Sequence, residues 1–184
     1  MEDYKSSASR ASVKKKPGEK YLLVDGYNII FAWEDLRELA EVNIDAARGK
    51  LLDIMSNYQG IRKCQLIVVF DAYRVVGHDT EILDYQNIHV VYTKEAETAD
   101  QYIEKFAHEH GRKYDVTVAT SDGMEQIIIR GQGCALLSAR ELLEEVKLAD
   151  RTIREEFLER QQKDRSYLLD SMSKEERKKI RDLE

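Results

Sequence analysis

The sequence predicts a three-layer α/β domain, with a mostly parallel central sheet of roughly five strands and helices on both faces. Two observations support this fold class. Short apolar runs rich in Val, Ile and Leu alternate along the chain with segments whose apolar residues recur at helical spacing. Strands that alternate with helices imply βαβ crossovers, which place successive strands parallel to one another. A length of 184 residues fits one such domain with a short extension at each end.

The elements are expected in a regular order along the chain. Strands are predicted over residues 21–25, 65–70, 88–92, 116–119 and 134–137, each of which is a short apolar run. Helices are predicted over residues 48–58, 98–110 and 124–130, where apolar side chains lie at helical spacing. A long helix begins at Ser138, in a Ser-x-x-Glu capping box with Glu141, and runs towards Phe157. The polar stretch 73–86 is predicted to be a loop or lid.

Three regions are expected along the chain. Residues 1–19 are rich in Ser, Lys and Ala and contain the only proline, so they are predicted to form a disordered basic tail or linker. Residues 20–160 are predicted to form the folded domain. Residues 161–184 are charged and are predicted to form a helical extension, with a short helix near Lys174 to Leu183.

The charge distribution bears on the partners of the protein. The formal net charge is −6, and residues 21–150 carry thirteen Lys and Arg against twenty-three Asp and Glu. A domain without a basic face gains little from releasing counterions, so we expect weak affinity for free RNA, with a larger partner supplying the positioning. A surplus of carboxylates fits a divalent-metal site, but a solvated acidic surface has the same composition.

The two cysteines and the apolar runs indicate the compartment. Cys64 and Cys134 lie in apolar stretches without a zinc-binding spacing, so both are interpreted as small buried residues of a protein in a reducing cytosol. No apolar stretch is long enough to cross a membrane. We therefore expect a soluble cytoplasmic protein without a membrane partner or a small-molecule cofactor.

Polar side chains are predicted to gather at one edge of the sheet. Asp25 and Asp71 end the first and second predicted strands, and Asp122 follows the fourth strand. Asp100 lies in the first turn of the helix after the third strand, and Asn28 follows Asp25 closely. In an open parallel sheet, ligands bind beyond the carboxyl ends of the strands, so these five residues are candidate catalytic residues.

Each of the four acids also has a structural alternative. Asp122 and Glu125 have the spacing of an N-cap box. Asp100 lies in the first turn of a helix, where the helix dipole stabilises a negative charge. Asp25 and Asp71 could be turn residues that follow strands. Taken together, four acids at one edge are hard to explain by capping alone. They would repel one another unless a cation is present, and carboxylate oxygens suit Mg²⁺ or Mn²⁺. Such a metal lowers the pKa of a bound water and neutralises phosphate oxygens, which is the chemistry of phosphodiester hydrolysis.

Five motifs in order resemble one known family. They are Val24-Asp-Gly-Tyr-Asn28, Val69-Phe-Asp-Ala72, Thr93-Lys-Glu-Ala-Glu-Thr-Ala-Asp100, Ala119-Thr-Ser-Asp122 and Ser138-Ala-Arg-Glu-Leu142. Together they resemble the YacP-like NYN family, part of the wider group of PIN-like nucleases, over roughly residues 21–157. The resemblance implies a PIN-like α/β fold, dependence on Mg²⁺ or Mn²⁺, and endonucleolytic cleavage of single-stranded RNA. It also implies association with the ribosome and cleavage of mRNA there, and related domains occur fused behind elongation-factor-like GTPases.

The resemblance also implies roles for individual residues. The metal ligands would be Asp25, Asp100 and Asp122. Asn28 would orient a ligand or the phosphate, and Asp71 would be a fourth acid or would support the others. Metal-bound water would be held by Thr120 and Ser121.

Further residues beside the predicted cleft are candidate RNA contacts. Lys94 and Arg74 could bind the RNA backbone, although exposed solubilising charges explain them equally well. Tyr73 could stack on a base, and Tyr27 fits core packing better than stacking. The four histidines share no ligand spacing and are assigned no catalytic role.

Two other functions are compatible with the same fold class. One is a non-catalytic RNA- or ribosome-binding adaptor, which a missing acid would have favoured. The other is a phosphatase or phospho-acceptor domain, because parallel α/β sheets with acidic rims also support that chemistry. The Asp-Gly-Tyr-Asn run lacks the Asp-x-Asp spacing expected for it.

Overall fold

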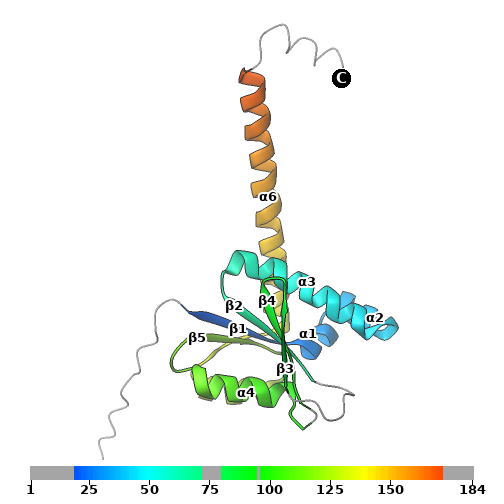
Figure 1. The fold of residues 1–184 in the computed structure, drawn as a ribbon, viewed down its shortest axis with the longest axis vertical. Helices are drawn as coiled ribbons and strands as arrows, with labels where there is room; N and C mark the ends of the chain where they lie inside the picture. The colour runs from blue at the N-terminus through cyan, green and yellow to red at the C-terminus, as the bar shows by residue number, and fades with distance from the viewer. Residues whose placement is uncertain (1–18, 72–79, 95, 172–184) are drawn as a thin grey trace, which may run out of the picture. The chain divides into compact units, whose positions relative to one another are not determined.

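A computed structural model describes residues 19–71, 80–94 and 96–171. The chain divides into two compact units, Met1–Leu143 and Glu144–Glu184. The first unit contains a six-stranded sheet with the strand order β3-β4-β2-β1-β5-β6. Figure 1 shows how its strands and helices are arranged. The strands are β1 (Lys20–Asp25), β2 (Gln65–Phe70), β3 (Glu81–Tyr85), β4 (Ile88–Tyr92), β5 (Asp115–Ala119) and β6 (Ala135–Leu137). The helices are α1 (Gly26–Ala32), α2 (Glu34–Val42), α3 (Ile44–Arg62), α4 (Ala99–His110), α5 (Gly123–Gly131) and α6 (Ala139–Ser171).

The sheet is parallel except at one edge. Strand β1 lies at its centre and pairs in parallel with β2 and β5, while β4 and β6 extend the parallel pairing outwards. Strand β3 runs antiparallel to β4. Parallel pairing brings the carboxyl ends of β1, β2, β4 and β5 to the same edge, which is where the candidate site is expected.

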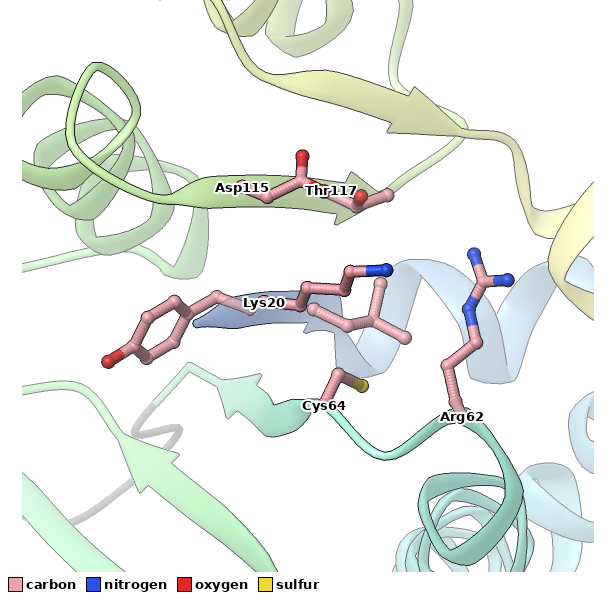
Figure 2. Close-up of a pocket in the computed structure, with 7 residues that line it drawn as sticks. Lys20, Arg62, Cys64, Asp115 and Thr117 are labelled. Carbon is pink, nitrogen blue, oxygen red and sulfur yellow. The ribbon is translucent and has the colours of Figure 1, made fainter. Parts of the chain in front are cut away.

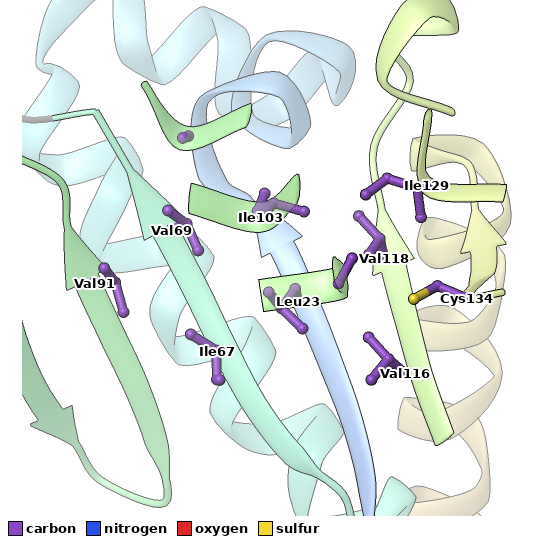
Figure 3. Close-up of a cluster of buried hydrophobic side chains, with 11 residues drawn as sticks. Leu23, Ile67, Val69, Val91, Ile103, Val116, Val118, Ile129 and Cys134 are labelled. Atoms are coloured by element: carbon purple, nitrogen blue, oxygen red, sulfur yellow. The ribbon is translucent and has the colours of Figure 1, made fainter. Parts of the chain in front are cut away.

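The core lies on both faces of the sheet. On one face, strand side chains such as Leu23, Val69 and Val118 meet Ile103 of α4 and Ile129 of α5 (Figure 3). Helix α3 covers the opposite face (Figure 1). Strands β1 and β2 are covered from both sides, which explains why they are continuous apolar runs and not alternating ones. The three-layer architecture is therefore confirmed, with both cysteines buried and free.

The prediction of a loop over residues 73–86 is wrong for its last part, because Glu81–Tyr85 forms strand β3, which was not among the five predicted strands. Strand β3 is an exposed edge strand, so it has no buried apolar face that a sequence pattern could reveal. Its hairpin with β4 turns at Gln86, which has the left-handed φ of 52°. Asn87 anchors the turn to α3 by donating to the Ser56 carbonyl at 3.1 Å.

The helical predictions differ from the structure at three places. Helices α1 and α2 were not predicted, because α1 has only 7 residues and α2 buries only Leu36. Helix α3 starts at Ile44, where the Asn43 side chain accepts from the N–H groups of Asp45 and Ala46. Helix α6 continues past the predicted end at Phe157 to Ser171. The short helix predicted near Lys174 to Leu183 and the tail over residues 1–18 lie outside the described residues.

Candidate metal centre

Asp25 is the residue around which the site is built. It ends the central strand β1 and caps α1, and its Oδ1 accepts a hydrogen bond from the Asn28 N–H at 3.1 Å. Only 7% of the residue is exposed. The next residue is glycine for a steric reason, because a Cβ at Gly26 would overlap the ring of Phe70 at the end of β2. The β1–α1 turn therefore holds the Asp25 carboxylate close to the end of β2.

Three carboxylates from distant parts of the chain meet at this edge. One oxygen each of Asp25, Asp100 and Glu125 lies within 4.8 Å of the other two. Asp100 comes from the first turn of α4, and Glu125 comes from the first turn of α5. A single cation could contact all three groups, because oxygen atoms that share a small divalent ion lie this close together.

Glu125 was not predicted as a site residue, because its spacing from Asp122 fits a capping box. No such box forms here. The Asp122 N–H donates instead to Thr120 Oγ at 3.1 Å, which leaves the Glu125 side chain free to turn into the site. Glu125 is 5% exposed, and neither carboxylate oxygen has a hydrogen-bond partner within the part of the chain that the structure describes. A buried carboxylate without partners is costly, and a bound cation would relieve that cost.

The electrostatics of the cluster favour a cation as well. Burial, together with the charges of Asp100 and Asp71, raises the pKa of Asp25 to about 7, against the lowering effect of the hydrogen bond from the Asn28 N–H. Burial and the charges of Asp100, Asp25 and Asp122 raise the pKa of Glu125 to about 7. The Thr120 side chain lowers this pKa, although the two side chains do not meet the geometry of a hydrogen bond. The pKa of Asp100 is raised mainly by desolvation of its carboxyl group, opposed by a hydrogen bond with Asp25. The hydrogen bond between Asp25 and Asp100 and the raised pKa of both carboxyl groups favour a proton shared between them.

Asp122 and Asp71 lie beside the cluster and have structural contacts of their own. Asp122 caps α5 by accepting from the N–H groups of Met124 at 2.8 Å and Glu125 at 3.2 Å. It is not among the three converging acids, but its charge raises the pKa of both Asp100 and Glu125. Asp71 accepts a hydrogen bond from the N–H of Ala99, the residue before Asp100. Asp71 thus attaches the start of α4 to the end of β2 and positions Asp100.

Asn28, Ser121 and Thr120 organise the loop that follows β5. Asn28 Oδ1 accepts from the Ser121 N–H at 2.7 Å, across 93 residues of sequence. Ser121 Oγ accepts in turn from the Ala139 N–H at 3.1 Å. Thr120 is fully buried. These bonds fix the loop that carries Asp122 and leads into α5.

The predicted RNA contacts are only partly described. Lys94 is exposed and follows β4 at the carboxyl edge. Arg74 and Tyr73 lie outside the described residues. Tyr27 is half-buried against Phe70, with ring centroids 5.2 Å apart, as expected for core packing.

A pocket of about 160 Å³ lies at the opposite edge of the sheet (Figure 2). It is lined by Lys20, Tyr21, Leu22, Arg62, Cys64, Asp115 and Thr117. Lys20 and Asp115 begin β1 and β5, whereas the acids follow the ends of these strands. The pocket is therefore separate from the acidic cluster.

Within the described ranges, no helix has the length and apolar character needed to cross a membrane.

Comparisons with known proteins identify a family and similar solved structures. A family model for the YacP-like NYN domain matches residues 22–184. The "Uncharacterized protein YacP" of Bacillus subtilis (strain 168) is 44% identical over 133 residues, which are 72% of this chain and 78% of that protein. The crystal structure of Rae1 (YacP) from Bacillus subtilis is similar with a TM-score of 0.67 and 39% identity, over 81% of this chain and 86% of that chain. A mutant of that protein gives a TM-score of 0.69 and 36% identity, over 90% of this chain and 99% of that chain.

Proposed function

Because the chain belongs to the YacP-like NYN family, we propose that it is a divalent-metal-dependent endoribonuclease that cleaves single-stranded RNA. The family relation supports a nuclease-like function connected with RNA. One observation carries the metal-dependent step: carboxylates of Asp25, Asp100 and Glu125 converge within 4.8 Å of one another, and Glu125 is buried without a hydrogen-bond partner among the described residues.

The donor set fits Mg²⁺ or Mn²⁺, which prefer carboxylate oxygens and retain several waters. Asp25, Asp100 and Glu125 would hold the ion, and Asp122 would add negative charge close by. When bound, such an ion supplies charge neutralisation at a phosphate oxygen and makes a water molecule more acidic. The proton that Asp25 and Asp100 share must leave before these side chains can act as ligands.

The surrounding residues position these groups. Asp71 fixes the start of α4 by accepting a hydrogen bond from the Ala99 N–H. Thr120 Oγ accepts from the Asp122 N–H, so the Glu125 carboxylate does not bind that N–H and can act as a ligand. The bond from Ser121 to Asn28 Oδ1 holds the plane of the Asn28 amide. Its NH₂ group would donate to a phosphate oxygen of the RNA.

The proposal extends to mRNA on the ribosome as the substrate. The acidic character of residues 21–150 supports it, because a domain with thirteen cationic and twenty-three anionic side chains gains little from contact with free RNA. A ribosome would present the strand to the cluster without the need for a basic groove. Tight, salt-insensitive binding of naked RNA by the isolated protein would contradict this part of the proposal.

Cleavage of a labelled single-stranded RNA tests the endoribonuclease directly. The wild-type protein should cut the RNA internally with Mn²⁺ and should lose the activity in EDTA. Asp25→Asn should remain folded and inactive, whereas Asp84→Asn, which replaces an exposed acid on β3, should cleave like the wild type. Full activity in Asp25→Asn would refute the assignment. Absence of cleavage of both free and ribosome-bound RNA by the wild type would favour a binding adaptor instead.

A further inference from the structure

A row of aromatic rings leads from the core to the surface next to the acidic cluster. Tyr92 stacks on Phe70 with ring centroids 5.7 Å apart, and Phe70 meets the ring of Tyr27 edge-on at 5.2 Å. Tyr27 stacks on Phe31 at 6.3 Å with an interplanar angle of 23°. Phe70 is fully buried, but Phe31 is 52% exposed. The outer end of the row is thus an aromatic surface accessible to a ligand.

The outer two rings belong to the helix that Asp25 caps. Tyr27 and Phe31 are four residues apart on α1, so they lie on the same side of this helix. Helix α1 directly follows β1 at the carboxyl edge (Figure 1). A rise of about 1.5 Å per residue places Phe31 roughly 9 Å along the helix from Asp25. A base attached to a nucleotide near the cluster can reach this distance.

Phe31 is not required to fill the core. Its neighbours Ile29 and Ile30 are fully buried, and Trp33 is buried and donates from Nε1 to the Ala139 carbonyl at 2.8 Å. These residues already attach α1 to the domain. A single exposed Phe is common on protein surfaces, but this ring is stacked on the ring of Tyr27, which lies two residues after Asp25.

The charge of the site indicates what the aromatic surface would bind. The acids at the carboxyl edge repel the phosphate backbone of RNA, apart from the phosphate that a cation would hold. Stacking of bases on aromatic rings does not depend on backbone charge and is a common way of holding unpaired RNA. A positively charged side chain lies beside the rings. The Arg48 guanidinium is 5.6 Å from the centroid of the Tyr27 ring and forms an ion pair with Asp45 at 2.8 Å.

We infer that Tyr27 and Phe31 form a stacking platform for one unpaired base of the RNA, next to the phosphate held at Asp25, Asp100 and Glu125. The inference rests on the proposed endoribonuclease function and specifies how its substrate is bound. It explains a requirement for single strands, because a base in a duplex has no free face to offer to Phe31.

Abasic substitutions in the RNA, combined with variants of Phe31, test the platform. The kcat/KM of cleavage is measured on single-stranded RNAs that lack one base at successive positions around the cut. For the wild type, one position should lower kcat/KM about 5- to 150-fold, the range expected for the loss of one stacked base. Phe31→Ala should show a loss of that size on intact RNA and no further loss at that abasic position. Phe31→Trp should retain wild-type behaviour, and so should the control Val42→Ala, which truncates an 86%-exposed residue on α2.

Wild-type kcat/KM for Phe31→Ala on intact RNA would overturn the platform and leave the endoribonuclease intact. Equal losses for Phe31→Ala on intact RNA and on every abasic RNA would overturn it too, because the side chain and the base would then act independently. A second measurement separates the two proposals. Fluorescence of 2-aminopurine in the RNA should be quenched by wild-type protein and not by Phe31→Ala. Quenching that depends on Phe31 without any cleavage would refute the proposed function while supporting the platform, and absence of both would refute both.

Discussion

Replacing Asp25 by Asn should stabilise the metal-free protein at alkaline pH and abolish its stabilisation by metal. The Asp25 carboxyl is buried, and its pKa is raised from 3.8 to about 7. The folded state therefore binds its proton more tightly than the unfolded state. Metal-free stability must fall as the pH rises from about 4 through about 7, where the buried carboxyl becomes charged. Asn removes this charge but keeps an Oδ1 that can accept from the Asn28 N–H, so the cap of α1 is preserved.

The size of the effect follows from the pKa. A change from 3.8 to about 7 corresponds to ~4 kcal/mol if all of it appeared in the free energy of unfolding above pH 7. Asp25 shares its proton with Asp100, so only part of this energy belongs to Asp25, and we expect ~2 kcal/mol. For a chain of 184 residues this is about 4–8 °C in Tm.

Thermal unfolding at pH 5 and pH 8, with EDTA or with Mn²⁺, measures this directly. In EDTA, Asp25→Asn should unfold at a higher temperature than the wild type at pH 8, with a smaller difference at pH 5. Mn²⁺ should raise the Tm of the wild type at pH 8 and leave that of the variant unchanged. If the variant is less stable than the wild type in EDTA at pH 8, the buried Asp25 charge is compensated without a metal and the predicted destabilisation is wrong.

Three further substitutions test individual contacts. Glu125→Gln should lower Mn²⁺ affinity at least ~10-fold by calorimetry while raising metal-free stability at pH 8, and unchanged affinity would remove Glu125 from the site. Asn28→Ala leaves the exposed Ser121 N–H without its protein acceptor and should cost ~0.5–1.5 kcal/mol in urea unfolding; no measurable change would show that the bond is unimportant. Gly26→Ala forces a Cβ against the Phe70 ring and should lower the free energy of unfolding by ~1–3 kcal/mol. The control Gly49→Ala on α3 places its Cβ in open space and should be neutral or stabilising by up to ~1 kcal/mol. Equal effects of the two glycine substitutions would contradict the close packing at Gly26.

The parallel core of the fold was predictable because buried strands and helices have apolar patterns of their own. Strand β2 is a continuous apolar run in a helix-covered sheet, and its bounds agree with the prediction. Strand β3 has mainly exposed side chains, so its position depends on pairing with β4 and on the turn at Gln86. Residues beyond Phe157 show no buried period, so the sequence predicted a separate helical extension over residues 161–184 and not one helix continuing to Ser171.

The candidate site shows the same limit at the level of single residues. Asp25 and Asp100 were predicted because they follow strands at one edge, and the structure brings them together with Glu125. Whether Glu125 caps α5 or enters the site depends on which acceptor the Asp122 N–H finds. Thr120 Oγ takes that N–H in the folded chain, and sequence spacing does not reveal this choice.

In the proposed function, Asp25, Asp100 and Glu125 hold the ion that makes the protein an endoribonuclease. The most direct test is one Mn²⁺ titration that follows metal binding by calorimetry and RNA cleavage on the same samples. For the wild type, half-maximal cleavage should occur at the Mn²⁺ concentration that half-saturates the protein, and Asp25→Asn should lose both binding and cleavage. Cleavage that persists in EDTA would show that the reaction does not depend on a metal, and Mn²⁺ binding that is equally strong in Asp25→Asn would exclude Asp25 as a ligand.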